Sequence, residues 1–139
     1  AMPLYICLRE KGAVPEDAKG PAAKALTKVH CDLTGAPATF VHVFFFEDGD
    51  ALPVPGEREA RFQLLGSIRS GRTDDLKDRL VLGMREALAT TLGVDLSEVA
   101  MNTRDVPAKW VMEGGELLPE PGEEAAWLAK HHAAAAAAN

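Results

Sequence analysis

The sequence predicts an α/β (α+β) fold in which one βαβ unit occurs twice. Each of two long amphipathic helices is flanked by apolar segments of strand length. The two halves span about 3–46 and 61–104, and a connector rich in Gly, Pro and Asp separates them at 47–60. Two such units predict a four-stranded sheet with both long helices on one face, and residues 105–132 complete the domain as a C-terminal segment.

The first half begins with a strand over Leu4–Leu8 and continues with a helix over about 15–34. Pro15 suits a first helical turn, and Gly35 is a plausible stop at the other end. Pro21 lies inside the helical pattern and predicts a kink or a later start. The apolar stripe of this helix consists of Ala22, Leu26, Val29 and Leu33.

The third element is a strand over Ala38–Phe46 that is apolar on both faces. Its alternating sets are Val41, Val43 and Phe45 on one face, and Phe40, Phe44 and Phe46 on the other. A strand that is buried on both faces needs cover on both sides. We therefore expect it to be central in the sheet. Because two helices cover only one face, we also expect subunits to associate.

The second half repeats this plan with a strand over Arg61–Ser67, a helix over Asp74–Leu92 and a strand over Val99–Thr103. Thr73 is placed to cap the helix, and Gly93 to end it. The apolar stripe consists of Leu76, Leu80, Met84, Leu88 and Leu92. Stripes of this kind are typical of a helix that packs on a core.

Length and composition indicate a single domain over 1–132, followed by a low-complexity tail at 133–139 that carries no fold prediction. The formal net charge of −6 argues against nucleic acid or an anionic membrane as a partner. The longest apolar run, Phe40 to Phe46, is far too short to span a bilayer. Cys7 and Cys31 show no metal or redox spacing and indicate a reducing, cytoplasmic environment.

Pro3 heads the first strand in the order Ala1-Met2-Pro3. If Met2 is the initiator and is removed, Pro3 carries a free secondary amine, with a reference pKa of roughly 8. Ala1 then reads as a remnant of cloning. While Met2 is attached, the Pro3 nitrogen is an amide and has no basicity. The alternative is that Pro3 only starts a strand, where its missing N–H is harmless.

Two arginines occupy the turn where the third strand runs into the second helix, within Arg69-Ser70-Gly71-Arg72. Sites in α/β sheets commonly lie at the carboxyl ends of strands. Two guanidinium groups and a helix N-terminus there are suited to a carboxylate. The alternative is a pair of solvated loop arginines.

His30 follows a stripe residue of the first helix, and Glu113 stands beside two glycines and a tryptophan. A desolvated carboxylate at Glu113 is suited to act as a base. The alternatives are a histidine satisfied by ordinary contacts and an exposed glutamate. The sequence contains no metal-ligand cluster, P-loop or glycine-rich dinucleotide turn, so we expect neither a metal nor a cofactor.

Together these features resemble the tautomerase superfamily, and within it the cis-3-chloroacrylic acid dehalogenase group. The similarity runs from Pro3 to about Trp127, nearly the whole domain. Its most specific pieces are Pro3, His30 within Lys28-Val29-His30-Cys31-Asp32-Leu33-Thr34-Gly35, the Arg69-Ser70-Gly71-Arg72 turn, Glu113, and Leu118-Pro119-Glu120-Pro121-Gly122-Glu123.

The resemblance implies a homotrimeric enzyme without a cofactor, in which Pro3 is the catalytic acid or base. Arg69 and Arg72 would bind the substrate carboxylate, and His30 would assist binding and polarisation. Glu113 would activate water, which in that group also requires a tyrosine. Asn102 stands in the place of that tyrosine and would contribute to substrate binding.

Because an amide cannot replace a phenol in acid–base chemistry, we expect tautomerisation of a small 2-oxo acid such as phenylpyruvate. The first alternative is hydration or hydrolytic dehalogenation of a short unsaturated acid. The second is a catalytically silent oligomeric protein that only binds ligand.

Overall fold

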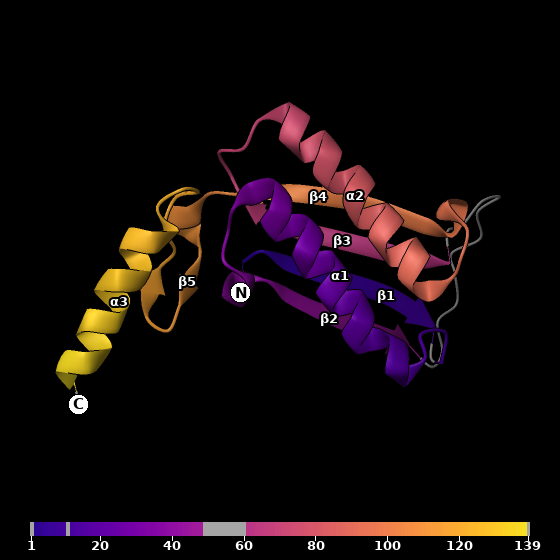
Figure 1. Ribbon diagram of the computed structural model, residues 1–139, viewed down its shortest axis with the longest axis horizontal. Helices are drawn as coiled ribbons and strands as arrows, with labels where there is room; N and C mark the ends of the chain where they lie inside the picture. The colour runs from indigo at the N-terminus through magenta and orange to yellow at the C-terminus, as the bar shows by residue number, and fades with distance from the viewer. Residues whose placement is uncertain (1, 11, 49–60, 139) are drawn as a thin grey trace.

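The computed structural model describes residues 2–10, 12–48 and 61–138. In this part of the chain a four-stranded sheet has the order β2-β1-β3-β4, and α1 and α2 lie on one face of it (Figure 1). The elements are β1 (Leu4–Glu10), α1 (Glu16–Thr34), β2 (His42–Asp48), β3 (Phe62–Arg69), α2 (Asp74–Leu92) and β4 (Val99–Val106). The predicted duplicated βαβ fold is confirmed. Of the predicted connector, residues 49–60 lie outside the described residues.

The two units meet through their first strands. β1 is parallel to β2, β3 is parallel to β4, and β1 and β3 pair antiparallel at the centre of the sheet. Leu4 at the start of β1 therefore pairs with Ser67 near the end of β3. This register brings Pro3 to the same end of the sheet as the turn between β3 and α2.

The expectation that the strand of the Ala38–Phe46 segment is central was wrong. Ala38–Phe40 forms a short 3₁₀ turn (η1), and β2 is an edge strand. Only the side of β2 that faces the helices joins the core, through Val43 and Phe45. On the other side Phe44 and Phe46 are 48% and 55% exposed. The double apolar pattern thus marks a sheet face that residues 2–10, 12–48 and 61–138 leave uncovered, because both helices lie on the opposite face.

The helices cover the sheet as their stripes predict. The residues that each buries are Ala22, Leu26 and His30 in α1, and Leu80, Met84, Leu88 and Ala89 in α2. Thr73 caps α2 by accepting a hydrogen bond from the Leu76 N–H at 3.2 Å. Both helices end at a glycine with left-handed backbone, Gly35 and Gly93, which a residue with a side chain adopts only at a cost. α1 runs through Pro21 without interruption.

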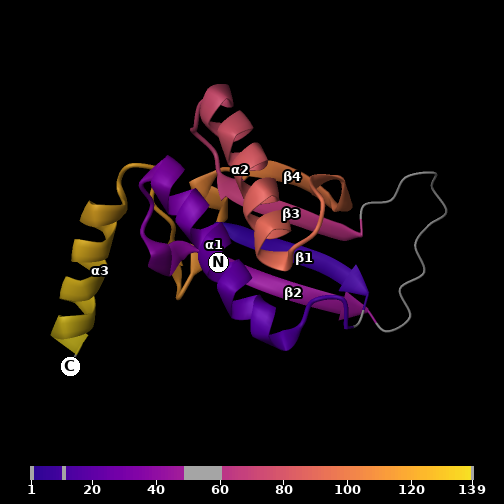
Figure 2. The same cartoon turned by 45° about the vertical axis from the view of Figure 1, so that its right-hand side comes forward.

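The C-terminal segment extends beyond one end of the sheet, and Figure 2 shows α3 standing off the main body. Its elements are η3 (Ala108–Trp110), β5 (Met112–Glu113), β6 (Glu116–Leu117) and α3 (Glu124–Ala138). Trp127 fixes the start of α3, because its ring meets Phe40 edge-on at 5.8 Å and its Nε1–H donates to the Leu117 carbonyl at 2.9 Å. α3 continues into the low-complexity tail, as the high helix propensity of alanine favours. No helix in the described ranges is both long and apolar enough to cross a membrane.

Candidate active site

The candidate site lies where β1 begins and β3 ends. Side chains alternate along β1, so Pro3 shares the helix-covered face with Tyr5 and Cys7. The Pro3 side chain is fully buried, and its carbonyl accepts a hydrogen bond from the His42 N–H at 3.0 Å. Met2, which is bonded to the Pro3 nitrogen, is only 6% exposed. In this chain the nitrogen is therefore covered as well as acylated.

His30 lies in the second half of α1 and is completely buried against the beginning of β1. Its Nδ1 atom lies 2.6 Å from the Tyr5 hydroxyl, and the two rings meet edge-on. Tyr5 is likewise 0% exposed. Tyr5 was not predicted as a site residue, although period-two alternation from Pro3 places it on the same face of β1.

Both partners of this hydrogen bond are neutral at pH 7. Burial, followed by the charges of Arg72 and Arg69, lowers the pKa of His30 to about 3. Burial raises the pKa of Tyr5 well above its ordinary value. The Tyr5 hydroxyl is therefore assigned as the donor to Nδ1, which leaves the ring proton of His30 on Nε2. Nε2 is buried, and no residue of the described ranges hydrogen-bonds to it.

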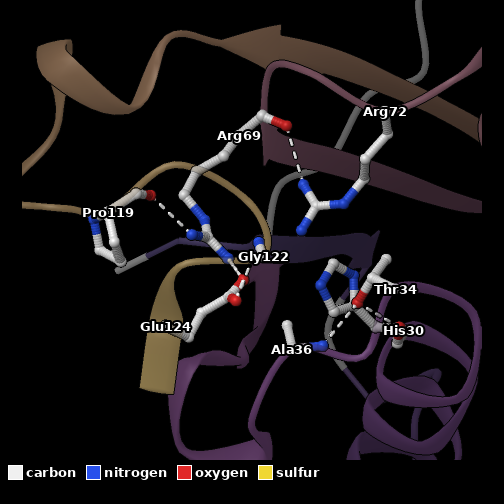
Figure 3. Close-up of polar contacts among 8 residues, drawn as sticks. All are labelled: His30, Thr34, Ala36, Arg69, Arg72, Pro119, Gly122 and Glu124. Atoms are coloured by element: carbon white, nitrogen blue, oxygen red, sulfur yellow. Dashed lines mark hydrogen bonds and ion pairs between the residues drawn. The ribbon is translucent and has the colours of Figure 1, made fainter. Parts of the chain in front are cut away.

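Arg72 supplies a second buried donor group. Its Nη1 donates to the Arg69 carbonyl at 2.8 Å, while Nη2 is buried without a hydrogen-bond partner among the described residues. Figure 3 shows the Arg72 guanidinium directed toward the imidazole of His30. Burial and the charge of Arg69 lower the pKa of Arg72, yet a guanidinium stays protonated at neutral pH. Two unsatisfied buried donors are thus presented at one place, as an anionic oxygen requires.

Arg69 is held differently from Arg72. Its guanidinium is 0% exposed, donates to the Pro119 carbonyl and to Glu124 Oε1 at 2.7 Å each, and lies over the Phe40 ring (Figure 3). Glu124 is also held by the Gly122 N–H, which donates to Oε2 at 2.9 Å. The C-terminal segment is therefore fastened to the end of β3 by a buried ion pair. Glu124 was missed from sequence, because no local pattern pairs it with a residue 55 positions earlier.

The remaining two predicted site residues lie in other places. Glu113 is half-buried in the β5–β6 hairpin, whose turn uses the positive φ of Gly114 and Gly115. Asn102 pairs with Leu65 in the middle of β4, on the sheet face opposite His30, and is exposed. Within one subunit, Pro3, His30, Arg69 and Arg72 thus lie at the same end of the sheet. Asn102 lies on the opposite face of the sheet. The predicted roles of all six residues stay predictions.

No family model and no curated protein sequence matches this chain. A solved structure does: N1, a member of the cis-3-chloroacrylic acid dehalogenase family, is 31% identical, with 91% of each chain covered and a TM-score of 0.84. This chain belongs to the tautomerase superfamily, in its cis-3-chloroacrylic acid dehalogenase group. The resemblance inferred from sequence is confirmed.

Two further solved structures support membership in the superfamily. Native Ps01740 is 31% identical, with a TM-score of 0.69 over 80% of this chain and 100% of its own. A fused 4-OT protein in a symmetric trimer is 28% identical, with a TM-score of 0.72 over 84% of this chain and 95% of its own.

Proposed function

We propose that the protein is a cofactor-free tautomerase that acts on small 2-oxo acids such as phenylpyruvate, with the amine of Pro3 as the proton carrier in a chain that begins there. The observation that carries the proposal is the pair of unsatisfied buried donors, His30 Nε2 and Arg72 Nη2, at the end of the sheet where Pro3 lies. A 2-oxo acid offers two acceptors for such donors, a carboxylate and an adjacent carbonyl or enol oxygen.

The reaction follows from these groups. The substrate carboxylate binds at Arg72, with Arg69 behind it, and the Nε2–H of His30 donates to the enol oxygen. The neutral Pro3 amine takes the proton from the enol hydroxyl and returns it to the adjacent carbon, so that the enol becomes the ketone with no net gain of atoms. Because the His30 ring is neutral, it stabilises the developing enolate as a hydrogen-bond donor rather than as a cation.

A second candidate is hydration or hydrolytic dehalogenation of a short unsaturated acid such as a cis-3-haloacrylate. It is favoured by the similarity to N1, which belongs to the cis-3-chloroacrylic acid dehalogenase family. Here Glu113 removes a proton from water while the oxygen adds to one alkene carbon, and protonated Pro3 gives its proton to the other. With a 3-haloacrylate the oxygen adds to C3, and the resulting 3-halo-3-hydroxy acid loses hydrogen halide to give 3-oxopropanoate. With Asn102 in place of a phenol, we expect this activity to be a weak side reaction.

The proposed assembly is a cytoplasmic homotrimer. The uncovered outer face of the sheet supports association, since Phe44 and Phe46 are each about half exposed there. The similarity to a 4-OT protein solved as a symmetric trimer supports the number three. Asn102 lies on this same outer face, so any contact with the site requires a neighbouring subunit.

The decisive experiment compares two forms of the protein, one beginning at Pro3 and one retaining Ala1-Met2, in the ketonisation of phenylenolpyruvate. Loss of an acid–base group costs about 10²–10⁴-fold, and the extended form should be slower by that factor. Equal rates for the two forms would exclude the Pro3 amine as the proton carrier. Tight binding of 2-oxo acids without turnover by either form would favour the ligand-binding alternative.

The two catalytic candidates are separated by the relative rates on phenylenolpyruvate and cis-3-chloroacrylate. The proposal predicts that the form beginning at Pro3 prefers the enol by orders of magnitude, and that Asn102→Tyr narrows the gap. If the unmodified site dehalogenates faster than it ketonises, the second candidate is the function.

A further inference from the structure

We infer that Glu124 sets the charge specificity of the site by neutralising one of its two arginines, so that the site accepts a monocarboxylate in preference to a dicarboxylate. The inference rests on the proposed function, because it concerns the same carboxylate-binding arginines. Its observations are the buried ion pair of Glu124 with Arg69 and the contrasting state of Arg72.

Arg69 and Arg72 are neighbours, but their guanidinium groups have different partners. The Arg69 side chain is 0% exposed, and Glu124 Oε1 lies 2.7 Å from its Nη2. Arg72 spends Nη1 on a backbone carbonyl and keeps Nη2 without a hydrogen-bond partner in the described part of the chain. The Nε of Arg69 is also buried without a hydrogen-bond partner in that part of the chain, but the charge of Arg69 is matched by Glu124. Arg72 therefore carries the charge available to a ligand.

Hydrogen bonds hold the Glu124 carboxylate in a fixed position. Both of its oxygens are used, one by Arg69 and the other by the Gly122 N–H, and Figure 3 shows the carboxylate facing the Arg69 guanidinium. Burial alone raises the pKa of Glu124, but the bond from Arg69 and the backbone N–H groups hold it below its ordinary value. Glu124 is thus an anion at neutral pH, as a carboxylate substrate is.

The local charge balance follows. Two guanidinium groups and one carboxylate leave one net positive charge. His30 adds none because its ring is neutral, and the Pro3 amine adds none in the neutral form that the proposed function uses. Asp105 also acts on Arg72, but its own charge is matched by Lys77, whose Nζ lies 2.9 Å from Oδ2. One net positive charge matches one carboxylate. A second carboxylate on the ligand would find no further unmatched cation among these groups, and the Glu124 charge would repel it.

Coulomb energy scales with the ligand's charge, so removing the Glu124 charge should favour a dianion about twice as much as a monoanion. The test is calorimetric binding of 2-oxopentanoate and 2-oxoglutarate to the full protein beginning at Pro3. These acids share a five-carbon 2-oxo chain and differ in the terminal carboxylate. The ratio of their dissociation constants cancels changes that affect both ligands equally.

The unmodified protein should bind 2-oxopentanoate at least about tenfold more tightly, which corresponds to about 1.4 kcal/mol. Glu124→Gln, which keeps the shape and a hydrogen-bond acceptor, should shift the ratio toward 2-oxoglutarate by about tenfold. Glu123→Gln is the matched control, because it makes the same charge change at the adjacent exposed position and should leave the ratio unchanged.

An unchanged ratio in Glu124→Gln overturns the inference, and so does an equal gain for both acids. If that variant does not fold, the unmodified protein decides alone, since tighter binding of 2-oxoglutarate contradicts the inference. Arg72→Ala separates this result from the proposed function. If it binds 2-oxopentanoate as well as the unmodified protein, the carboxylate site itself is misplaced, and the proposed function fails with it.

Discussion

The two helices bury residues at the same three positions and differ in what they place there. Each has 19 residues, and the seventh, eleventh and fifteenth are Ala22, Leu26 and His30 in α1, and Leu80, Met84 and Leu88 in α2. His30 and Leu88 are both 0% exposed. The second half of the duplication has a leucine at the third position. The first half has an imidazole there, which is hydrogen-bonded to Tyr5.

This difference places a polar group in one half and an apolar group in the other, at equivalent positions of the core. A buried polar group costs free energy unless it is hydrogen-bonded, and among the described residues only one nitrogen of His30 has a partner. The second half carries no such cost at its matching position. The first half is therefore the one in which a core position carries a polar group, and the proposed function gives that group its chemical role.

The largest expected effect comes from giving α1 the residue of α2. His30→Leu should slow ketonisation of phenylenolpyruvate by about 10²–10³-fold, because it removes the donor to the developing enolate. The free energy of unfolding should change by less than about 2 kcal/mol, since apolar burial offsets the lost bond to Tyr5. Steady-state kinetics and urea denaturation measure the two quantities.

The matched control is Leu88→Met, a nearly volume-conserving change at the equivalent position of α2 that should leave the rate unaltered. A His30→Leu enzyme of normal rate would return His30 to a purely structural role.

The reciprocal change should damage stability instead of chemistry. Leu88→His buries an imidazole without a tyrosine beside it and removes apolar volume from the core, at an expected cost of about 2–5 kcal/mol in the free energy of unfolding. Urea denaturation measures this cost. A variant as stable as the parent would mean that the two helix positions are not equivalent in packing.

The outer faces of the two edge strands give the next prediction. β2 presents Phe44 and Phe46 there, whereas β4 presents exposed Asn102 and Arg104. Phe44→Lys should therefore weaken the proposed trimer, and sedimentation velocity at micromolar concentration should show smaller species. Leu82→Lys is the control, because Leu82 is 63% exposed on α2 and lies on the helix side. Identical sedimentation of all three proteins as monomers would contradict the proposed assembly.

The last expected effect is a pH dependence of stability that comes from His30. Its pKa is about 3 in the folded protein and about 6.5 in an unfolded chain, so the unfolded chain binds more protons between these values. The contribution of His30 is complete above about pH 6.5 and is lost progressively as the pH falls toward about 3. Denaturation at pH 7 and pH 4.5 should show a smaller loss in His30→Leu than in the parent.

Much of this comparison was readable from sequence, because apolar periodicity reports which side of an element is buried. The limits of α2 agree with the predicted Asp74–Leu92, where a capping threonine and a glycine mark both ends. The place of β2 in the sheet was not readable in this way. A strand that is apolar on both faces looks the same at the centre of a sheet and at an edge that another subunit would cover.

The candidate site was readable only in part. Pro3, His30, Arg69 and Arg72 were nominated through local motifs and the family resemblance, and the register of β1 with β3 brings Pro3 to the arginine turn. Tyr5 and Glu124 were missed because their partners lie 25 and 55 positions away. Alternation along β1 places Tyr5 on the face of Pro3, but its contact with His30 and that of Glu124 with Arg69 depend on tertiary packing, which no local pattern shows.

The central claim is that the Pro3 amine moves the proton, and its titration tests this most directly. In a uniformly ¹⁵N-labelled protein beginning at Pro3, NMR gives the pKa of that amine, and the pH profile of ketonisation gives the pKa of the catalytic group. The nearby guanidinium charges and burial should lower the amine pKa below its reference of about 8, and the rate should rise with pH through the same value. An amine that titrates at about 8 or higher, with a rate that does not follow it, would contradict the account.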